Sequence, residues 1–429
     1  MRRRYPRPGR PAFAALLLAA CALARAAAPD LPVATPASVG VSAERLARID
    51  AYLEAEVAAR HKAGVVALIA RHGKIVYFKA FGSADLASGR PMRTDDYFRL
   101  WSMTKPVTAV ALLTLYEQGR FRLTDPLADY LPAFRDVRVL AGSDERGEPV
   151  YEKPTRPITI QDVFRHTAGF TYGYFGDTPV DRAYRDAGID YAKLGSPRAM
   201  AEKMAAMPLL YQPGTRWVYS FAADVQAALV ERLSGMRFDA YCEQVIFRPL
   251  GMKDTFFGVP ASRRARFATS YSPDQAGALV VTRAGPAAVD LDQMYEHFTD
   301  HPFGGAGLTS TPADYLRFAE MLLHGGELGG HRILGRKTVE LMTSDHLPPG
   351  VEDVAPGLRF GLGVDFLASP ARAGNAGSVG QYGWGGLATT DYVADPKEDL
   401  VALLFAQYVP TDNRFEEAWR ALAYQALVR

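Results

Sequence analysis

Apolar residues at both ends of the chain follow patterns that are typical of β-strands. Residues 65–70 and 75–81 are two apolar runs around a short polar turn, which predicts a β-hairpin. Residues 389–394 and 400–409 are also strand-like, and apolar residues alternate with Gly or Asp over 360–366. The two ends of the chain are therefore expected to supply a β-sheet.

Elsewhere, apolar positions mostly recur with helical spacing. Two of the predicted helices are closed by Gly119 and Gly235, and a capping-box pattern over 159–162 begins a short one. Pro312 directly after Thr311 marks the first turn of another, which runs to a pair of glycines. The expected helices cover residues 41–60, 106–118, 159–166, 224–233, 311–324 and 414–429.

The order of these elements predicts the fold class. Strands at both ends and helices between them fit an α+β (α/β) protein, in which one antiparallel sheet is flanked by helices. A chain of 429 residues suits two domains, or one large domain with a sizeable insertion. We expect residues 29–120 and 300–429 to form the α/β domain and residues 121–299 to form a mostly helical lobe, with the functional site in the crevice between them.

The N-terminus has the pattern of an export signal. Five Arg within the first ten residues precede an apolar run over 12–24, and Ala-x-Ala sequences follow it. The run is too short for a stable membrane span. Residues 1–28 are therefore predicted to be a signal peptide of a periplasmic or secreted protein. The sequence Leu18-Ala19-Ala20-Cys21 also resembles a lipobox, so the alternative is a lipoprotein anchored through Cys21.

Removal of this segment changes the charge balance. Six Arg lie in residues 1–28, so 43 basic residues would remain against 47 acidic ones. No basic patch is left to indicate a nucleic-acid partner. Cys242 is then the one Cys of the mature chain, and its helix-like surroundings favour a buried structural thiol.

The strongest candidate for chemistry is the S-x-x-K sequence Ser102-Met103-Thr104-Lys105. Residues three apart on a helix share a face, so the hydroxyl and the amine can meet. Pro106 is tolerated in a first helical turn, which places Ser102 at the helix start. A lysine can take the serine proton if burial disfavours its ammonium form. By itself the motif also fits a Ser N-cap followed by a surface Lys.

With its neighbours, this motif resembles the nucleophile segment of the serine β-lactamase and penicillin-binding-protein superfamily. Further stretches resemble landmarks of the same superfamily, in the same order: residues 158–169, 212–220 and 304–314. The likeness spans residues 38–428. It implies a β-lactamase/transpeptidase-like fold and a serine acyl-transfer enzyme without a cofactor or metal.

The second motif of that superfamily is Tyr-x-Asn, and here it reads Tyr219-Ser220-Phe221. The resemblance implies that Tyr219 shares a proton with Lys105 and passes it to the leaving group. Phe221 replaces the amide that β-lactamases place near the substrate, so it is expected to contact the substrate as an apolar side chain.

The third motif is Lys-Thr-Gly in β-lactamases, and here it reads Trp384-Gly385-Gly386. No cation is present to pair with the carboxylate of a penicillin or a peptide, and Trp384 offers an apolar wall instead. This W-G-G resembles the family VIII carboxylesterases of the same superfamily. Two glycines also let the backbone approach a ligand closely.

The resemblance implies a mechanism in which Ser102 attacks an ester carbonyl and forms an acyl-enzyme. The backbone N–H groups of Ser102 and Leu387 are expected to hold the oxyanion. Tyr219 is expected to activate the deacylating water. The pocket walls are expected to include Phe170, Tyr172, Tyr174 and Trp384.

The histidines are weaker candidates. His166 lies near a predicted helix C-terminus, where a structural role is favoured. His297 and His301 flank Asp300, but no third ligand and no His-Glu-x-x-His sequence accompanies them, so zinc is not expected. The chain also lacks G-x-S-x-G, which argues against an α/β-hydrolase.

The sequence thus predicts a serine carboxylesterase that acts on small-molecule esters. The first alternative is a β-lactamase or D-alanyl-D-alanine carboxypeptidase, whose substrates would be β-lactam-like. The second, from another class, is a ligand-binding protein that has lost turnover. The sequence does not determine the oligomeric state.

Overall fold

The computed structural model describes residues 30–282 and 290–429. The predicted signal peptide and Cys21 lie outside the described residues. Among the helices of the described ranges, none combines the length and apolar character that a bilayer crossing needs.

An eight-stranded sheet joins the two ends of the chain, in the order β13-β14-β15-β16-β17-β1-β2-β3. Its paired neighbours run antiparallel, as predicted, and β1 pairs with β17 so that Leu68 lies opposite Leu403. The strands are β1 (Gly64–Arg71), β2 (Lys74–Asp85), β3 (Arg90–Pro91), β13 (Leu358–Phe360), β14 (Asp365–Leu367), β15 (Tyr382–Gly386), β16 (Thr390–Asp395) and β17 (Leu400–Ala406).

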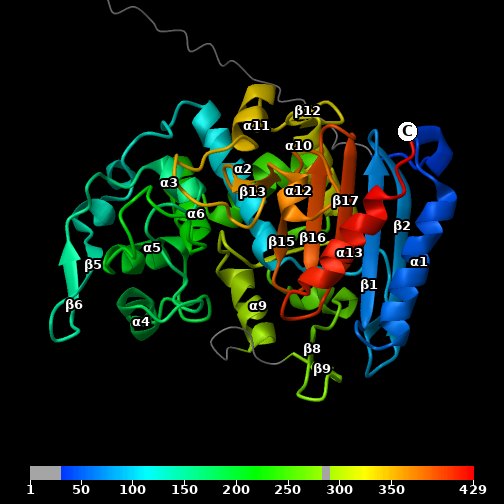
Figure 1. Cartoon of the computed structure of the whole chain (residues 1–429), viewed down its shortest axis with the longest axis horizontal. Helices are drawn as coiled ribbons and strands as arrows, with labels where there is room; N and C mark the ends of the chain where they lie inside the picture. The colour runs from blue at the N-terminus through cyan, green and yellow to red at the C-terminus, as the bar shows by residue number, and fades with distance from the viewer. Residues whose placement is uncertain (1–29, 283–289) are drawn as a thin grey trace, which may run out of the picture.

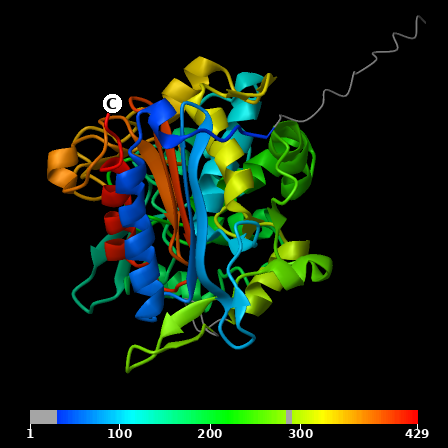
Figure 2. The ribbon, with the colours of Figure 1, turned by 90° about the vertical axis from the view of Figure 1, so that its right-hand side faces the viewer.

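Helices cover both faces of this sheet (Figures 1 and 2). The helices α1 (Ala43–Ala58) and α13 (Asn413–Tyr424) lie on one face, and α2 (Thr104–Glu117) and α10 (Pro312–Leu323) lie on the other. Strand β1 is buried along its whole length because its alternate side chains enter two different cores. Val65, Ala67 and Ile69 pack toward α1 and α13, whereas Val66, Leu68 and Ala70 belong to the core on the α10 side.

The middle of the chain forms a helix-rich lobe beside the sheet (Figure 1). Two peripheral hairpins, β5–β6 and β8–β9, and the short strand β7 also come from it; β7 pairs with β10, and β10 with β4. The bounds are α3 (Ile160–Phe164), α4 (Pro179–Asp186), α5 (Pro197–Ala205), α6 (Ala222–Ser234), α7 (Phe238–Cys242), α8 (Arg248–Leu250), α9 (Leu291–Asp300), β4 (Phe98–Arg99), β5 (Val139–Ser143), β6 (Pro149–Glu152), β7 (Phe256–Phe257), β8 (Tyr271–Pro273), β9 (Leu279–Val281) and β10 (Leu308–Ser310).

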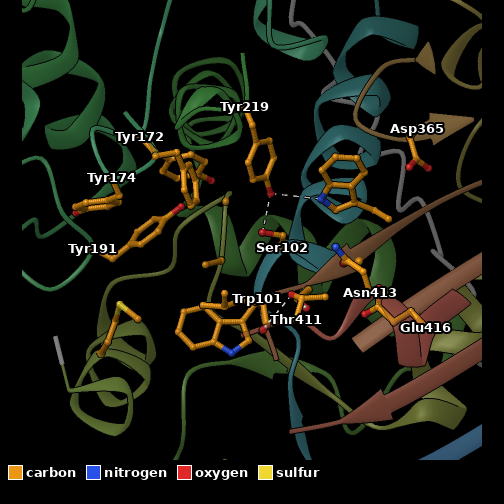
Figure 3. A pocket seen from close by; sticks show the side chains of 18 of the residues that line it. Trp101, Ser102, Tyr172, Tyr174, Tyr191, Tyr219, Asp365, Thr411, Asn413 and Glu416 are labelled. Carbon is orange, nitrogen blue, oxygen red and sulfur yellow. Dashed lines mark hydrogen bonds between the residues drawn. The ribbon is translucent and has the colours of Figure 1, made fainter. Parts of the chain in front are cut away.

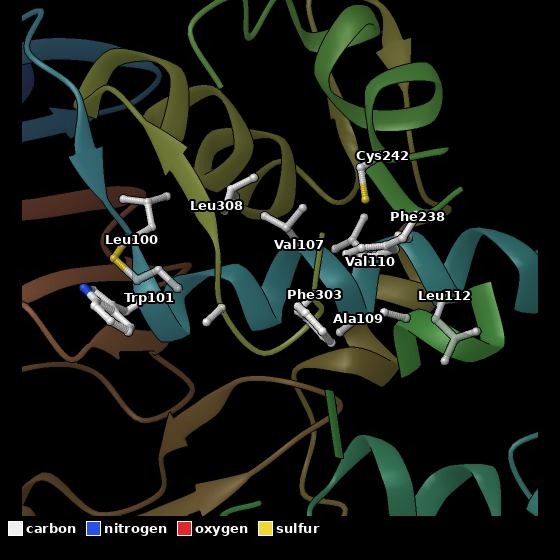
Figure 4. Packing of buried hydrophobic residues seen from close by; sticks show 14 of the residues in the cluster. Leu100, Trp101, Val107, Ala109, Val110, Leu112, Phe238, Cys242, Phe303 and Leu308 are labelled. Atoms are coloured by element: carbon white, nitrogen blue, oxygen red, sulfur yellow. The ribbon is translucent and has the colours of Figure 1, made fainter. Parts of the chain in front are cut away.

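Helix α2 connects the lobe to the sheet. Its residues 104–115 are all buried, because it lies within the main core, where it packs on α6. A helix that is enclosed all round needs apolar residues on every face, which explains the run of Val, Ala and Leu in its sequence. Figure 4 shows this packing, in which Cys242 is buried as predicted. Burial raises the pKa of the Cys242 thiol, consistent with a structural role.

Most of the predicted elements are present, although β17 and α13 end earlier than predicted, at Ala406 and Tyr424, and one predicted strand is divided. The alternation over 360–366 is not a single strand but the end of β13, a turn and the start of β14, which pair with each other. Gly363 adopts a left-handed φ of +87°, and a Cβ there would lie 2.5 Å from that of Ala109. The turn therefore requires glycine. The remaining elements are β11 (Glu327–Leu328), β12 (His331–Arg332), α11 (Arg336–Met342) and α12 (Pro370–Ala373).

Candidate active site

Ser102 lies in a single 3-10 turn, Trp101–Met103, between β4 and the first turn of α2. Trp101 has a φ of +49°, an uncommon conformation for a bulky residue. The backbone of Trp101 is fixed on both sides of its Cα. Its N–H donates to the Tyr295 hydroxyl at 2.9 Å, and its carbonyl oxygen accepts from Thr104 Oγ1 at 2.6 Å. Such strain persists only where the surroundings determine it, and here it orients the residue before Ser102.

The structure brings Ser102, Lys105 and Tyr219 together. Lys105 Nζ donates to Ser102 Oγ at 3.0 Å. The Tyr219 hydroxyl donates to the same oxygen at 2.7 Å, as Figure 3 shows. Lys105 and Ser102 meet because they are one helical turn apart, whereas Tyr219 arrives from the segment before α6. The serine oxygen therefore has two groups within reach of proton transfer.

Lys105 is buried, with 2% of its surface exposed. Its Nζ also donates to the Gly305 carbonyl oxygen at 2.7 Å and lies 4.8 Å from the centre of the Tyr219 ring. These contacts hold the amine beneath Ser102 rather than in solvent.

Asp224, at the start of α6, completes this support. It is fully buried; its Oδ1 accepts from the Gly305 N–H at 2.8 Å and its Oδ2 from the Tyr191 hydroxyl at 3.0 Å. Burial raises the pKa of Asp224 to about 6. A Cβ at residue 305 would lie 2.6 Å from Asp224 Oδ2, so glycine is needed there. Sequence reasoning missed this role, because nothing in the local spacing distinguishes Asp224 from any acidic residue in a first helical turn.

Aromatic side chains surround Tyr219. Trp384 Nε1 donates to the Tyr219 hydroxyl at 3.4 Å, and the two ring centres are 5.5 Å apart. His166 lies 5.1 Å from the Tyr219 ring, and its Nδ1 is 3.1 Å from Ser220 Oγ. Burial, and then the charge of Lys105, lower the pKa of His166 to about 3, so its ring is neutral. This placement fits the structural role expected for His166.

A cavity of about 440 Å³ opens above Ser102. Figure 3 shows Ser102 between tyrosines of the lobe on one side and the β15 and α13 region on the other. Of the residues predicted to bind substrate, Tyr172, Tyr174, Trp384, Gly385 and Gly386 line it. The full lining is Trp101, Ser102, Tyr172, Tyr174, Phe175, Asp190, Tyr191, Tyr219, Met294, Gly305, Ala306, Asp365, Trp384, Gly385, Gly386, Leu387, Thr411, Asn413, Glu416 and Arg420.

Two predicted wall residues lie elsewhere. Phe221 is fully buried behind the tyrosines, 4.3 Å from the Tyr172 ring and 5.2 Å from the Tyr191 ring. Phe170 packs 5.5 Å from the ring of Phe134 in the lobe core. Both predictions of substrate contact are therefore corrected: these rings support the wall and do not form it. Their position in the sequence does not reveal that other aromatic side chains cover them.

Strand β15 passes very close to the nucleophile segment. A Cβ at Gly386 would lie 2.3 Å from the carbonyl oxygen of Leu100, two residues before Ser102. The glycine therefore allows a backbone approach that a side chain would block. Leu387 follows directly and, like Ser102, lines the cavity. The pairing of their N–H groups as an oxyanion hole remains a prediction.

The other histidines named from the sequence bind backbone carbonyls. His297 Nε2 lies 2.9 Å from the Leu194 oxygen, and His301 Nδ1 lies 2.7 Å from the Gly195 oxygen. Their rings are 4.2 Å apart. Both side chains thus attach α9 to the loop before α5.

Comparison with known proteins places this chain in a family. A family model described as Beta-lactamase matches residues 49–427. Protein Rv1367c of Mycobacterium tuberculosis is 34% identical over 362 residues, which cover 81% of this chain and 86% of that protein. Esterase EstB of Burkholderia gladioli is 32% identical over 382 residues, which cover 85% of this chain and 90% of the esterase.

A solved structure, EstCE1, described as a hydrolase with promiscuous acyltransferase activity, superposes with a TM-score of 0.76 at 26% identity. The alignment covers 89% of this chain and 99% of EstCE1. These matches confirm the β-lactamase/transpeptidase-like fold and the superfamily resemblance that the motifs indicated.

Proposed function

Because the chain belongs to the Beta-lactamase family of serine hydrolases, we propose that it cleaves carboxylic esters through an acyl-enzyme on Ser102. The observation that carries this proposal is the pair of hydrogen bonds, from Lys105 and from Tyr219, that meet at Ser102 Oγ on the floor of a cavity. A serine hydroxyl becomes a useful nucleophile when a neighbouring group accepts its proton.

The arrangement suggests the order of events. Ser102 Oγ attacks the ester carbonyl carbon while its proton passes to the Lys105–Tyr219 pair. The carbonyl oxygen becomes an oxyanion, for which the N–H groups of Ser102 and Leu387 are the proposed donors. The C–O bond to the alcohol then breaks, and Tyr219 returns the proton to the departing oxygen. Water adds to the acyl-enzyme by the same route in reverse, which releases the acid and restores Ser102.

The third motif favours esters over β-lactams and peptides. Where a cation would bind the carboxylate of those substrates, Trp384 contributes an indole that contacts Tyr219. The relative EstB is named an esterase, and EstCE1 is described as a hydrolase with acyltransferase activity. Both names agree with ester chemistry at this site.

Hydrolysis of p-nitrophenyl acetate and butyrate, compared with hydrolysis of nitrocefin, tests the proposal. We expect ester turnover in the wild type, its loss in Ser102→Ala, and its retention in Ser88→Ala, which changes an exposed serine in the turn between β2 and β3. Mass spectrometry after mixing with p-nitrophenyl butyrate should show one added butyryl group, absent from Ser102→Ala.

Two other results would replace the proposal. Nitrocefin turned over orders of magnitude faster than the esters would identify a β-lactamase. No turnover of either class by folded protein would indicate a binding protein.

A further inference from the structure

The cavity continues past the third motif along the free edge of β15. Strand β14 pairs with β15 only through Asp365–Gly383 and Phe366–Tyr382. Residues 384–386 therefore have no β14 partner on that side, and the cavity extends around them toward α13. Figure 3 shows Asp365, Asn413 and Glu416 there, across Ser102 from the tyrosines.

The first glycine of the motif keeps this extension open. A Cβ at Gly385 would point into it, 3.8 Å from Asp391 Oδ1 and 4.0 Å from Glu416 Oε2. The W-G-G sequence therefore both lets β15 approach Ser102 and leaves a path to a group of carboxylates. We call Asp365, Asn413 and Glu416 the acidic subsite.

Carboxylates outnumber cations around this part of the cavity. Arg420, the cation among the lining residues, is fully engaged by Asp391, which accepts from its Nε at 2.9 Å and its Nη2 at 2.6 Å. The charge of Arg420 also acts to lower the pKa of Asp365 and of Glu416, but burial outweighs it at both residues. Asp365 and Glu416 line the cavity, and neither makes a direct ion pair among the described residues, since Arg420 is paired with Asp391.

Within the acidic subsite, Glu416 has the clearest unpaired acceptor. It is 7% exposed, and its Oε1 has no hydrogen-bond partner within the described part of the chain. A buried acceptor that is left unpaired costs about 1–3 kcal/mol, and more when it is charged. Burial, followed by the nearby charge of Asp391, raises the pKa of Glu416, and burial raises that of Asp365 to about 7. A bound hydrogen-bond donor with a positive charge would relieve both effects.

We propose that the acidic subsite binds a primary ammonium group carried by the ester substrate. An ammonium has three donors, so it can bind the Glu416 carboxylate and donate further to acceptors of the subsite such as the Asp365 carboxylate. A substrate carboxylate would meet like charges at the same place. The proposal rests on the esterase function proposed above and adds the substrate class to it.

Matched esters test the subsite. The first pair is 4-(aminomethyl)phenyl acetate and 4-(hydroxymethyl)phenyl acetate, which places the ammonium on the alcohol side. The second pair is p-nitrophenyl 4-(aminomethyl)benzoate and its hydroxymethyl counterpart, which places it on the acyl side. We expect the ammonium ester of at least one pair to be favoured about tenfold or more in kcat/KM, since charge-assisted bonds in a desolvated site are strong.

Two substitutions test which residue causes the preference for the ammonium ester. Within each variant the ratio of the two kcat/KM values is compared, so a general loss of activity cancels. Glu416→Gln should bring the ratio to within about twofold of unity, because the charge is removed at constant shape. Glu417→Gln, an exposed neighbour on the same helix, should keep the wild-type ratio. A wild-type ratio near unity in both pairs, or a preference that survives Glu416→Gln, would overturn the subsite while leaving the esterase function intact.

A binding experiment covers the case in which no ester is turned over. Benzylammonium and benzyl alcohol are titrated into the Ser102→Ala protein by calorimetry. Tighter binding of benzylammonium that is lost in Ser102→Ala/Glu416→Gln supports the subsite independently of catalysis. Equal or undetectable binding of both probes contradicts it.

Discussion

Asp224 and Lys105 bind the two ends of one residue, Gly305. Asp224 accepts from the Gly305 N–H at 2.8 Å, and Lys105 donates to the Gly305 carbonyl oxygen at 2.7 Å. The acid therefore fixes the carbonyl that holds the amine, and the amine holds Ser102 Oγ. The catalytic pair on α2 is thus positioned by α6 and by the glycine-rich turn before β10.

This relationship predicts different effects for two substitutions of Asp224. Asp224→Asn keeps an oxygen that can accept from Gly305, so most of kcat should remain. Asp224→Ala frees the Gly305 peptide and lets Lys105 shift, which should lower kcat for p-nitrophenyl butyrate by about 10–100-fold with little change in KM. Circular dichroism checks that both variants are folded. Equal kcat in the wild type and Asp224→Ala would exclude a positioning role.

Tyr219 should be essential for its hydroxyl rather than for its ring. Tyr219→Phe keeps the contacts with Trp384 and His166 but removes the donor to Ser102, and kcat for p-nitrophenyl butyrate should fall by about 10²–10⁴-fold. Tyr174→Phe is the matched control, because Tyr174 lines the same cavity and its hydroxyl binds the Ile189 carbonyl. If both variants lose activity equally, the effect belongs to the cavity wall and not to proton transfer.

The two glycines of the third motif should respond differently to alanine. At Gly386 a Cβ would lie 2.3 Å from both the Leu100 oxygen and Thr390 Oγ1, so Gly386→Ala must displace β15 or the nucleophile segment. Such overpacking costs about 1–3 kcal/mol, so we expect a lower Tm and a loss of most ester turnover. At Gly385 the nearest atom would be the Thr390 oxygen at 3.5 Å, an ordinary contact, and Gly385→Ala should keep the wild-type Tm. Thermal unfolding of the two variants decides the matter, and equal Tm values would be contrary to this geometry.

The parts of the site that could be predicted are those encoded locally or in ordered motifs. Ser102 and Lys105 meet through the geometry of one helix turn, so their spacing suffices to predict the contact. The second and third motifs identify Tyr219 and Trp384 as site residues. Their contacts depend on packing between segments that are distant in the chain. The sheet followed from apolar patterns at both chain ends, although the pairing of β1 with β17 is a long-range contact.

The roles of three residues could not be predicted from the sequence: Asp224, Gly305 and Glu416. Each acquires its role from partners on another element, such as the Gly305 peptide for Asp224, and no local pattern of residues records such a contact. For Phe221 the motif could be recognised, but the placement of the side chain could not be predicted. Whether an aromatic side chain lines a cavity or supports its wall depends on the rings that cover it.

Asp162 provides a pH-dependent test of how the lobe is held together. It is fully buried and receives hydrogen bonds from Arg156, Arg165 and the backbone N–H of Thr159, whose capping box begins α3. Burial acts to raise its pKa, but these bonds outweigh burial and lower the pKa of Asp162 to about 2. Because the folded state holds the carboxylate more strongly than the unfolded chain does, its contribution to stability is complete above about pH 4 and disappears as the pH falls toward 2.

Asp162→Asn should therefore lower the free energy of unfolding by about 3 kcal/mol at pH 7, since it leaves two arginines without their buried acceptor. The difference from the wild type should shrink in urea denaturation series between pH 4 and pH 3. Asp181→Asn, in the capping box of α4, should show a smaller loss, because the bonds to its side chain come from hydroxyl and backbone donors and not from arginine. A loss for Asp162→Asn that stays constant down to pH 3 would mean that packing, and not the charge of this carboxylate, stabilises the start of α3.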